Sequence, residues 1–341
     1  MGKRLLIIQP SHYRSKSDLT PHKTKRRNLV GLTLPYLAAL TPPDWDVGLV
    51  DEQLMDIDFN APADLIAISA WTINSFRAYE IGDAFRKRGI PVIMGGPHTY
   101  FYGEESAEHC DAVGIGEAET IWRVMLEDAA SLRLKKFYRA EQLQDLAGLP
   151  MPRHNLLDLG KYGFIKTFSV QSSRGCPFHC EFCSERFYLG QGYRQRPVGD
   201  VVEEIKQTGA KHIFFADSNF GGKPAHTIAL MEALIPLRIR WSGLFPAYLC
   251  NNVKFMDLAK RSGLLHVNIG IESIDQTTLA GLGKKSNNVR HYREILRNLR
   301  EREISYSLNF ILAGTVKLRM SFRPPWHSSE RRKYLRPISI Y

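Results

Sequence analysis

Three of the five cysteines in this 341-residue sequence lie within eight residues, at Cys176, Cys180 and Cys183. This spacing places three thiolates on one tight loop, and an iron-sulfur cube normally takes one thiolate per iron. The fourth iron would stay open to an exogenous ligand, which suits catalysis. Zinc would need a fourth ligand, and His179 points away from a common tetrahedral set with its neighbour Cys180. Three purely structural thiols are the remaining alternative.

The cysteine loop directly follows the first of five strands expected in the second half of the sequence. These strands are residues 168–173, 212–217, 241–249, 265–271 and 305–312, and helices are expected at 201–208, 227–234, 253–261 and 289–302. Repeated βα units predict a barrel or partial barrel over residues 166–314. The functional side chains of such a barrel follow the carboxyl ends of its strands, where the cysteine loop lies.

Two of these strands carry polar residues along one face. The strand at 265–271 places His266, Asn268, Gly270 and Glu272 opposite Val267, Ile269 and Ile271, and the last strand alternates in the same way. Both faces of a barrel strand are normally buried, so a polar row needs partners, and a polar ligand in the lumen would supply them. An edge strand with one solvated face is the alternative.

The first 130 residues alternate short β-branched strands with helices. Strands are expected at residues 4–9, 46–51, 64–70, 91–94 and 112–115, and helices at 32–39, 75–88, 104–109 and 121–129. This alternation predicts a doubly wound, Rossmann-like α/β domain over residues 1–145, whose ligand would lie beyond the carboxyl ends of the strands. Residues 146–165 contain two prolines, Pro150 and Pro152, and no clean period, and we expect a linker there.

The cysteine loop resembles the signature of radical S-adenosylmethionine (SAM) enzymes, with the aromatic Phe182 before the last cysteine. The resemblance implies that Cys176, Cys180 and Cys183 hold a 4Fe-4S cluster and that SAM chelates its open iron. One electron would then cleave SAM to a 5'-deoxyadenosyl radical, which abstracts hydrogen from an inert carbon. The cofactor supplies this chemistry, and the protein supplies its orientation.

The same resemblance suggests further SAM contacts beside Phe182. Gly270-x-Glu272 would approach the ribose and amino groups of SAM, with Glu272 as an acceptor, although a structural hydrogen bond is the alternative. Asp217 and Asn219 end the second strand, where this family commonly places polar residues near the cofactor. Outside these positions, we expect Cys250 at the end of the third strand and Cys110 to be buried structural thiols.

An α/β domain before such a barrel is similar to the cobalamin-binding class of radical SAM enzymes, and the likeness covers residues 3 to about 314. Cobalamin domains often carry Ser-x-Leu and a later Gly-Gly pair; here Ser69-Ala-Trp71 precedes Gly95-Gly96, with 25 residues between Ser69 and Gly95. The resemblance suggests Ser69, Gly95 and Gly96 as cobalamin contacts. The motif for the lower cobalt ligand is missing, and we expect His12 to be an ordinary loop histidine.

Within that class, the segments MGGPHTYFY and CSERFYLG resemble those of bacteriochlorophyll side-chain methyltransferases. The resemblance implies methyl transfer from cobalamin to an unactivated carbon of a tetrapyrrole, with a reducing electron donor as partner. A radical SAM cyclase or rearrangement enzyme would show the same cysteines. A transfer-RNA methylthiotransferase fits poorly, because its first domain binds a second cluster through three cysteines and this one has only Cys110.

Charge and hydropathy restrict the expected partners and the expected location of the protein. The net charge is +11, but residues 315–341 alone supply +6, so we expect no nucleic-acid partner. The basic cluster at residues 22–27 (HKTKRR) is either a solvated loop or a contact for an anionic ligand or surface. No membrane span, signal peptide or myristoylation site is apparent, and the expected location is the cytoplasm, where five cysteines argue for metal rather than disulfides.

The last 27 residues, 315–341, follow neither a helical nor a strand period and contain a Pro-Pro pair. We expect an irregular, aberrant tail that leaves the barrel C-terminally truncated after five strands. The strand at 305–312 would then form an open edge. Under this hypothesis the chain is an inactive cluster-binding relic.

Overall fold

The computed structural model describes residues 2–15, 17–190 and 192–311. The chain forms two compact units, which we call the first and the second unit. The first comprises Met1–Gly175 and Ser184–Phe214, and the second comprises Cys176–Cys183 and Phe215–Tyr341. The chain therefore enters the second unit at the cysteine loop, returns to the first unit, and leaves it again after residue 214.

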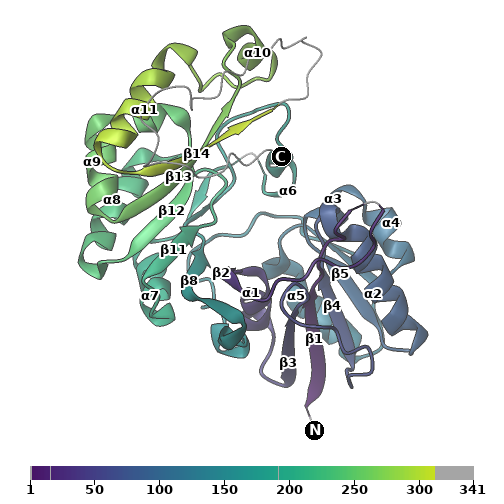
Figure 1. Ribbon diagram of the computed structural model, residues 1–341. Helices are drawn as coiled ribbons and strands as arrows, with labels where there is room; N and C mark the ends of the chain where they lie inside the picture. Colours follow the sequence, from purple (N-terminus) through teal and green to yellow (C-terminus); the bar gives the residue numbers. More distant parts are fainter. Residues whose placement is uncertain (1, 16, 191, 312–341) are drawn as a thin grey trace. The chain divides into compact units, whose positions relative to one another are not determined.

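A six-stranded parallel sheet forms the centre of the first unit (Figure 1). Its order is β3-β1-β4-β5-β6-β7, with β1 at Lys3–Gln9, β3 at Trp45–Asp51, β4 at Leu65–Ser69, β5 at Val92–Gly95, β6 at Ala112–Ile115 and β7 at Phe137–Arg139. The five strands expected here are present and β7 is additional. The order reverses between β1 and β4, and a doubly wound sheet binds its ligand beyond the carboxyl ends of the strands at such a point.

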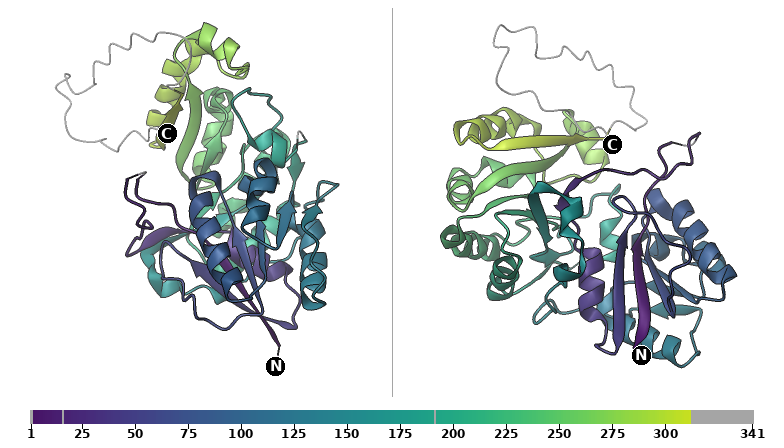
Figure 2. Two further views of the ribbon diagram at one scale, coloured as in Figure 1. Left: turned by 90° about the vertical axis from the view of Figure 1, so that its right-hand side faces the viewer. Right: turned by 60° about the horizontal axis from the view of Figure 1, so that its bottom comes forward.

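Helices cover both faces of this sheet (Figure 1 and Figure 2). Successive strand residues point to opposite faces, so Ile7 and Ile8 of β1 belong to two separate cores. The core around Ile7 includes α1 (Thr33–Leu40) and α5 (Ala118–Ala130), and the core around Ile8 includes α2 (Ser75–Lys87) and α4 (Gly103–Glu108). The short α3 (Pro97–Phe101) and the 3-10 turn η1 (Thr72–Asn74) follow β5 and β4.

The rest of the first unit includes the strands that flank the cysteine loop in the sequence. The strand β8 (Tyr162–Val170) pairs in parallel with β2 (Arg27–Val30), and β9 (Ser173–Arg174) pairs in antiparallel with β10 (Arg194–Gln195). The remaining elements are η2 (His154–Leu156), η3 (Leu159–Lys161), α6 (Glu185–Tyr188), α7 (Val198–Thr208) and β11 (His212–Phe215). The residues between β7 and β8 are mostly irregular. The first strand of the second half, expected at residues 168–173, is β8, which begins six residues earlier, so residues 162–165 of the expected linker belong to a strand.

The second unit contains the parallel strands β12 (Arg240–Phe245), β13 (Leu264–Glu272) and β14 (Ser305–Phe310), in the order β14-β13-β12. Its helices are α8 (Pro224–Leu234), α9 (Val253–Arg261), α10 (Gln276–Gly281) and α11 (Tyr292–Glu301), with the short turns η4 (Ile235–Leu237), η5 (Ala247–Asn251) and η6 (Val289–His291). The expected alternation of strand and helix is confirmed, and α10 is an addition to it.

The third strand of the second half is shorter than expected. It ends at Phe245, and residues 247–251 form the turn η5. Pro246 lacks the backbone N–H that a central strand needs, so the apolar residues after it leave the sheet. The expectation that Cys250 ends this strand is therefore wrong: Cys250 is a buried thiol in η5.

The polar row of β13 finds partners within the sheet. The two ring nitrogens of His266 lie 2.9 Å from Ser305 Oγ and 3.1 Å from Ser307 Oγ on β14. Val267 and Ile269, on the other side of β13, are buried. Cross-strand hydrogen bonds thus satisfy part of the row for which we expected a ligand.

The basic cluster at residues 22–27 contacts acidic groups of the chain itself. Lys23 Nζ donates to the carbonyl oxygens of Glu52 and Met55, and Arg27 Nη1 lies 2.9 Å from Asp51 Oδ2. Neither side chain is simply solvated. Within the described ranges, no helix is long and apolar enough to cross a bilayer. The expected tail at 315–341 lies outside the described residues.

Candidate active site

The cysteine loop begins directly after β9, and none of its three cysteines belongs to a disulfide. Cys180 is buried, whereas Cys176 and Cys183 are half-buried. The N–H of Cys183 donates to the carbonyl of Cys180 at 3.2 Å, which turns the backbone sharply between these two cysteines. Asn219 Nδ2 donates to Cys176 Sγ at 3.4 Å. A donor of this kind stabilises negative charge on sulfur and tunes a bound cluster.

The end of β13 places a carboxylate and a lysine beside this loop. Glu272 Oε1 lies 3.2 Å from Lys284 Nζ, and both side chains are largely buried. Glu272 adopts a positive φ of 63°, and the register of β13 with β14 shifts between Gly270 and Glu272. Asn287 Nδ2 donates to the carbonyl oxygens of Gly270 and Ile271 at 2.8 and 3.1 Å. Asn287, which lies outside the strand, therefore stabilises the distorted end of β13 through these two hydrogen bonds.

Gly270 leaves room for this ion pair. A Cβ atom on Gly270 would overlap Glu272 Oε1 and would lie 3.1 Å from Lys284 Nζ. The absence of a side chain at position 270 thus lets the pair approach the backbone. Gly270 and Glu272, which the sequence analysis singled out together, belong to one local arrangement.

Lys284 connects this arrangement to the cysteine loop. Its Nζ lies 5.6 Å from the centroid of the Phe182 ring, a cation-π contact. The N–H of Glu181 donates to the carbonyl of Leu282 at 3.1 Å, so the backbones of the two loops are also joined. The structure therefore brings Phe182, Glu272 and Lys284 together. The sequence alone does not predict Lys284 as a site residue, because no spacing rule relates it to Glu272.

The charges around Cys180 act in opposite directions. Burial raises the pKa of the Cys180 thiol, the positive charge of Lys284 lowers it, and the neighbouring thiols of Cys176 and Cys183 raise it further. A thiol that resists ionisation in the metal-free protein, with one cation beside it, is suited to a thiolate whose charge is neutralised by iron.

The donor set fits an iron-sulfur cube better than a single ion. Within residues 2–15, 17–190 and 192–311, no three His, Cys, Asp or Glu side chains are placed to hold one metal ion. A cube takes its thiolates at different corners, so they stand further apart than the ligands of mononuclear zinc. Cys176, Cys180 and Cys183 could therefore hold a cluster, with Asn219 donating to one of its thiolates.

The remaining candidate residues of this region and its surroundings are two polar residues, Asp217 and Asn219, and two further cysteines, Cys110 and Cys250. Asp217 and Asn219 are buried beyond the end of β11, which closes at Phe215. Cys110 is fully buried in the first unit, and burial raises the pKa of its thiol and that of Cys250 to about 12. Both are inert structural thiols, as expected.

Ser69, Gly95 and Gly96 meet at the carboxyl edge of the first sheet. Ser69 pairs with Gly95 in the register of β4 and β5. Gly96 has a φ of 103°, and a Cβ there would lie 2.6 Å from the carbonyl oxygen of Ala70 and 3.2 Å from Ser69 Oγ. Only glycine allows this approach, which opens the β5 turn beside the point where the strand order reverses.

His12 lies on the loop after β1 and stacks on His22, with 5.0 Å between the ring centroids. The N–H of His22 donates to the carbonyl of His12 at 2.7 Å. These contacts give His12 a local structural role, in line with our expectation for this residue.

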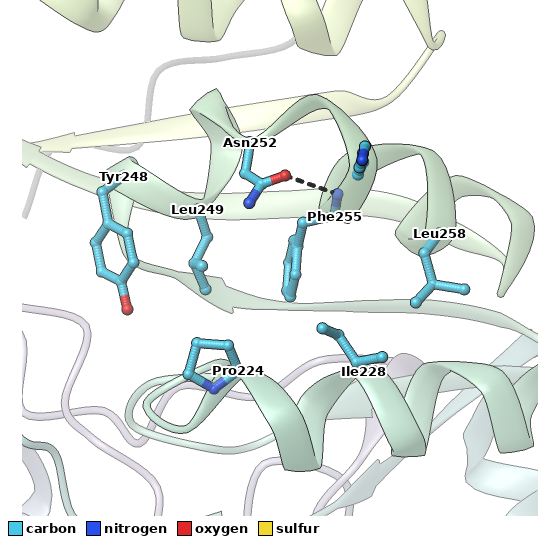
Figure 3. Close-up of a pocket in the computed structure, with 8 residues that line it drawn as sticks. Pro224, Ile228, Tyr248, Leu249, Asn252, Phe255 and Leu258 are labelled. Carbon is cyan, nitrogen blue, oxygen red and sulfur yellow. Dashed lines mark hydrogen bonds between the residues drawn. The ribbon is translucent and has the colours of Figure 1, made fainter.

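A cavity of about 520 Å³ lies between α8 and the η5–α9 segment (Figure 3). Its lining is mostly apolar and consists of Pro224, Ile228, Tyr248, Leu249, Asn252, Lys254, Phe255 and Leu258. None of the residues expected to bind a cofactor lines it. One end approaches the cysteine loop, since the Tyr248 ring lies 6.1 Å from that of Phe178.

Comparison with known proteins agrees with this geometry. A family model described as the radical SAM superfamily matches residues 170–317. The chain is 30% identical over 312 residues to the bacteriochlorophyllide d C-8(2)-methyltransferase of Chlorobaculum tepidum, covering 86% of this chain and 69% of that protein. It is 27% identical over 332 residues to the C-12(1)-methyltransferase of the same organism, covering 94% and 72%.

A solved structure shows the fold. TsrM, a radical SAM methyltransferase from Kitasatospora setae with cobalamin and a [4Fe-4S] cluster bound, superposes with a TM-score of 0.72 at 18% identity. The match covers 91% of this chain and 69% of TsrM. The fold is thus α/β, with the curled parallel sheet of a half-barrel. By motif, fold and sequence, the chain belongs to the radical SAM superfamily.

Proposed function

We propose that this protein is a cobalamin-dependent radical SAM methyltransferase that methylates an unactivated carbon of a tetrapyrrole in bacteriochlorophyll biosynthesis. The observation that carries the proposal is the extent of the similarity to two bacteriochlorophyllide methyltransferases, which spans 86% and 94% of this chain. A similarity limited to the cluster-binding region would support radical chemistry alone.

Superfamily membership implies a 4Fe-4S cluster and SAM as cofactors. We infer that Cys176, Cys180 and Cys183 provide the three thiolates and that the open iron faces SAM. When bound, these groups would supply a 5'-deoxyadenosyl radical that abstracts hydrogen from the substrate carbon. The amide of Asn219 stabilises the thiolate of Cys176 through its hydrogen bond.

For SAM itself we propose the arrangement at the end of β13. Glu272 would accept from the ribose or amino group, and Lys284 holds its carboxylate in place. Gly270 leaves the space that this ion pair occupies beside the backbone. Phe182 offers an apolar ring face next to the cluster, and Asp217 is a buried carboxylate two residues before Asn219.

For cobalamin we propose the carboxyl edge of the first sheet, within a Rossmann-like, cobalamin-binding domain at residues 1–145. Ser69, Gly95 and Gly96 would contact the corrin or its tail. When β2 is left out of the numbering, the strand order of this sheet is 2-1-3-4-5-6, and its reversal lies next to Ser69. Because His12 is stacked on His22, we propose that cobalt receives no histidine ligand from this loop.

We further propose that residues 146–165 link this domain to a radical SAM partial barrel at 166–314. Cleavage of SAM needs a one-electron donor, which would be a separate reducing partner. The cytoplasm suits a protein whose Cys176, Cys180 and Cys183 form no disulfide.

The test is anaerobic reconstitution with iron, sulfide and hydroxocobalamin, followed by metal counting and turnover with SAM, a reductant and a bacteriochlorophyllide d. The expected result is iron and cobalt on the same chain and a product heavier by one methylene. Cys180→Ala should abolish cluster binding, and Cys110→Ala serves as the matched control. Ring closure without added carbon would identify a radical cyclase instead, and failure to bind iron would overturn the proposal.

A further inference from the structure

The two ends of the segment that carries the cluster cysteines are held together, because the flanking strands β9 and β10 pair with each other. Strand β9 ends at Arg174 and β10 begins at Arg194, and the two arginines are direct partners in this antiparallel ribbon. Gly175, with a φ of 81°, lies so close to the carbonyl of Gly192 that a Cβ would overlap it. The two ends of the stretch are therefore fixed side by side.

One carboxylate binds both ends. Glu117 Oε1 lies 3.2 Å from Arg174 Nη1 and 2.7 Å from Arg194 Nη2. Its second oxygen, Oε2, accepts from Arg194 Nη1 at 2.9 Å and from the backbone N–H of Gln144 at 2.7 Å. Arg194 thus makes a two-point contact with Glu117, the geometry that best fixes a guanidinium.

Further contacts complete this charged cluster. Glu119 Oε1 lies 2.5 Å from Arg174 Nη2 and accepts from the hydroxyl of Tyr36 at 2.8 Å. Arg194 also donates to the carbonyl oxygens of Gln144 and Leu189, at 2.6 and 3.0 Å. Two carboxylates and two guanidiniums balance in charge, as a buried cluster requires.

Glu117 is only 6% exposed and lies two residues beyond β6, at the carboxyl edge of the first sheet. Burial works to raise the pKa of Glu117, but hydrogen bonds from Arg194 and Gln144 and the charge of Arg174 outweigh it, so the pKa is lowered. The side chain is therefore an anion held in place by the stretch that it binds.

Aromatic contacts join the same edge to the segment after the last cysteine. The rings of Tyr100 and Phe101, in α3 after β5, meet those of Phe187 and Tyr188 in α6 edge to face, with centroids 6.3 to 6.5 Å apart. The β5 and β6 turns of the first sheet thus contact both flanks of the cysteine loop.

We propose that Glu117 is a positioning residue for the cluster: it clamps Arg174 and Arg194 and so sets the conformation of the loop that carries Cys176, Cys180 and Cys183. The relevance to catalysis rests on the proposed function, but the clamp itself does not. Because Glu117 belongs to the edge proposed for cobalamin, the loop would also respond to a ligand bound there.

The first experiment uses the metal-free full chain under reducing, anaerobic conditions. The alkylation rate of each cysteine by iodoacetamide is followed by mass spectrometry in wild type, Glu117→Gln, Arg194→Gln and the double variant. Cys110 and Cys250, both fully buried, report global unfolding within the same molecule. Glu204→Gln is the matched control, because Glu204 is also a buried carboxylate paired with an arginine, Arg196, at 2.5 Å.

We expect the alkylation rate of Cys180 in Glu117→Gln to rise about fivefold or more beyond the rates of Cys110 and Cys250, because local opening exposes Cys180 before the whole chain unfolds. The effect of the double variant should be smaller than the sum of the two single effects, because both substitutions remove the contact between Glu117 and Arg194. Equal acceleration at all cysteines, or the same Cys180 effect in Glu204→Gln, would reduce Glu117 to a general stability role and overturn the proposal.

A second readout follows the reconstituted cluster. Glu117→Gln should lose iron to a chelator several-fold faster and shift the electron paramagnetic resonance signal of the reduced cluster, whereas Glu204→Gln should do neither. Glu117→Asp, which keeps the charge, should restore part of the difference. An unchanged signal and chelation rate in Glu117→Gln would contradict the clamp even if methyl transfer were lost.

Discussion

Glu272 shows how the site depends on single residues. It is a non-glycine residue with a φ of 63°, a conformation that costs on the order of 1–3 kcal/mol and persists only where neighbours enforce it. Here Lys284 holds the carboxylate and Asn287 holds the carbonyls of Gly270 and Ile271. Strain at a strand end beside the cysteine loop is consistent with a ligand-binding role for this carboxylate.

Lys284→Met should destabilise the protein, because it leaves the carboxylate of Glu272 buried without its cation. The pair is partly accessible, so we expect a loss of about 1–3 kcal/mol in the free energy of unfolding, between the values for exposed and buried pairs. Urea denaturation would measure it. Lys285→Met, which changes the exposed neighbour, is the control and should cost little.

Gly270→Ala should weaken SAM binding while the fold is retained. The new methyl group would meet Glu272 Oε1 and Lys284 Nζ, so the ion pair must move. The change that SAM causes in the spectrum of the reduced cluster would measure binding, and we expect an affinity loss of about tenfold or more. Gly281→Ala, where a Cβ meets nothing within 4 Å, is the matched control. Equal SAM affinity in both variants would exclude Gly270 from the site.

At the level of elements, the sequence predicts what is regular and hydrophobic. All five expected strands of the first sheet are present, because each is a β-branched run long enough to form a buried parallel strand. The short elements β2, β7 and α10 were missed, since their residues carry no clear period. The predicted third strand of the second half extends four residues beyond the real end at Phe245. The apolar residues after Pro246 are typical of a strand, but they belong to η5.

Helix α9 begins at a side-chain cap that can be tested. Asn252 Oδ1 accepts from the N–H of Phe255 at 3.0 Å (Figure 3). Asn252→Ala removes this acceptor and should lower the free energy of unfolding by about 1 kcal/mol, whereas Asn252→Ser keeps an acceptor and should cost much less. Thermal unfolding of the two variants would show the difference. Equal losses would mean that packing of Asn252, rather than its cap, is what matters.

The turn η2 contributes a pH dependence. Burial lowers the pKa of His154 to about 4. An unfolded histidine titrates near pH 6.5, so between about pH 6.5 and 4 the unfolded chain binds a proton that the folded chain does not. Stability should therefore fall as the pH drops through this window. The midpoint of urea unfolding in His154→Gln should depend less on pH there, and parallel profiles for variant and wild type would contradict this assignment.

At the scale of the whole molecule, long-range contacts decide what a sequence cannot show. The cysteine motif, Gly270 and Glu272 could be selected from spacing and resemblance alone. Lys284 and the pairing of Glu117 with Arg174 and Arg194 could not, because 57 and 77 residues separate Glu117 from its two partners. Such pairs carry no local pattern, and only the folded chain brings them together.

This long-range pairing predicts how the chain can be divided. A fragment of residues 1–145 contains Glu117 and Glu119 but lacks Arg174 and Arg194, whereas a fragment of residues 1–214 keeps all four. Glu117→Gln should therefore cost about 3–5 kcal/mol in the full chain and in 1–214, where it leaves buried guanidiniums with one carboxylate too few. In 1–145 the same substitution should cost almost nothing, because the pairing is already absent. Urea unfolding of the three chains with and without the substitution measures the difference. A similar cost in 1–145 would mean that Glu117 stabilises the first sheet locally, so that the cysteine loop could be rebuilt or replaced without disturbing it.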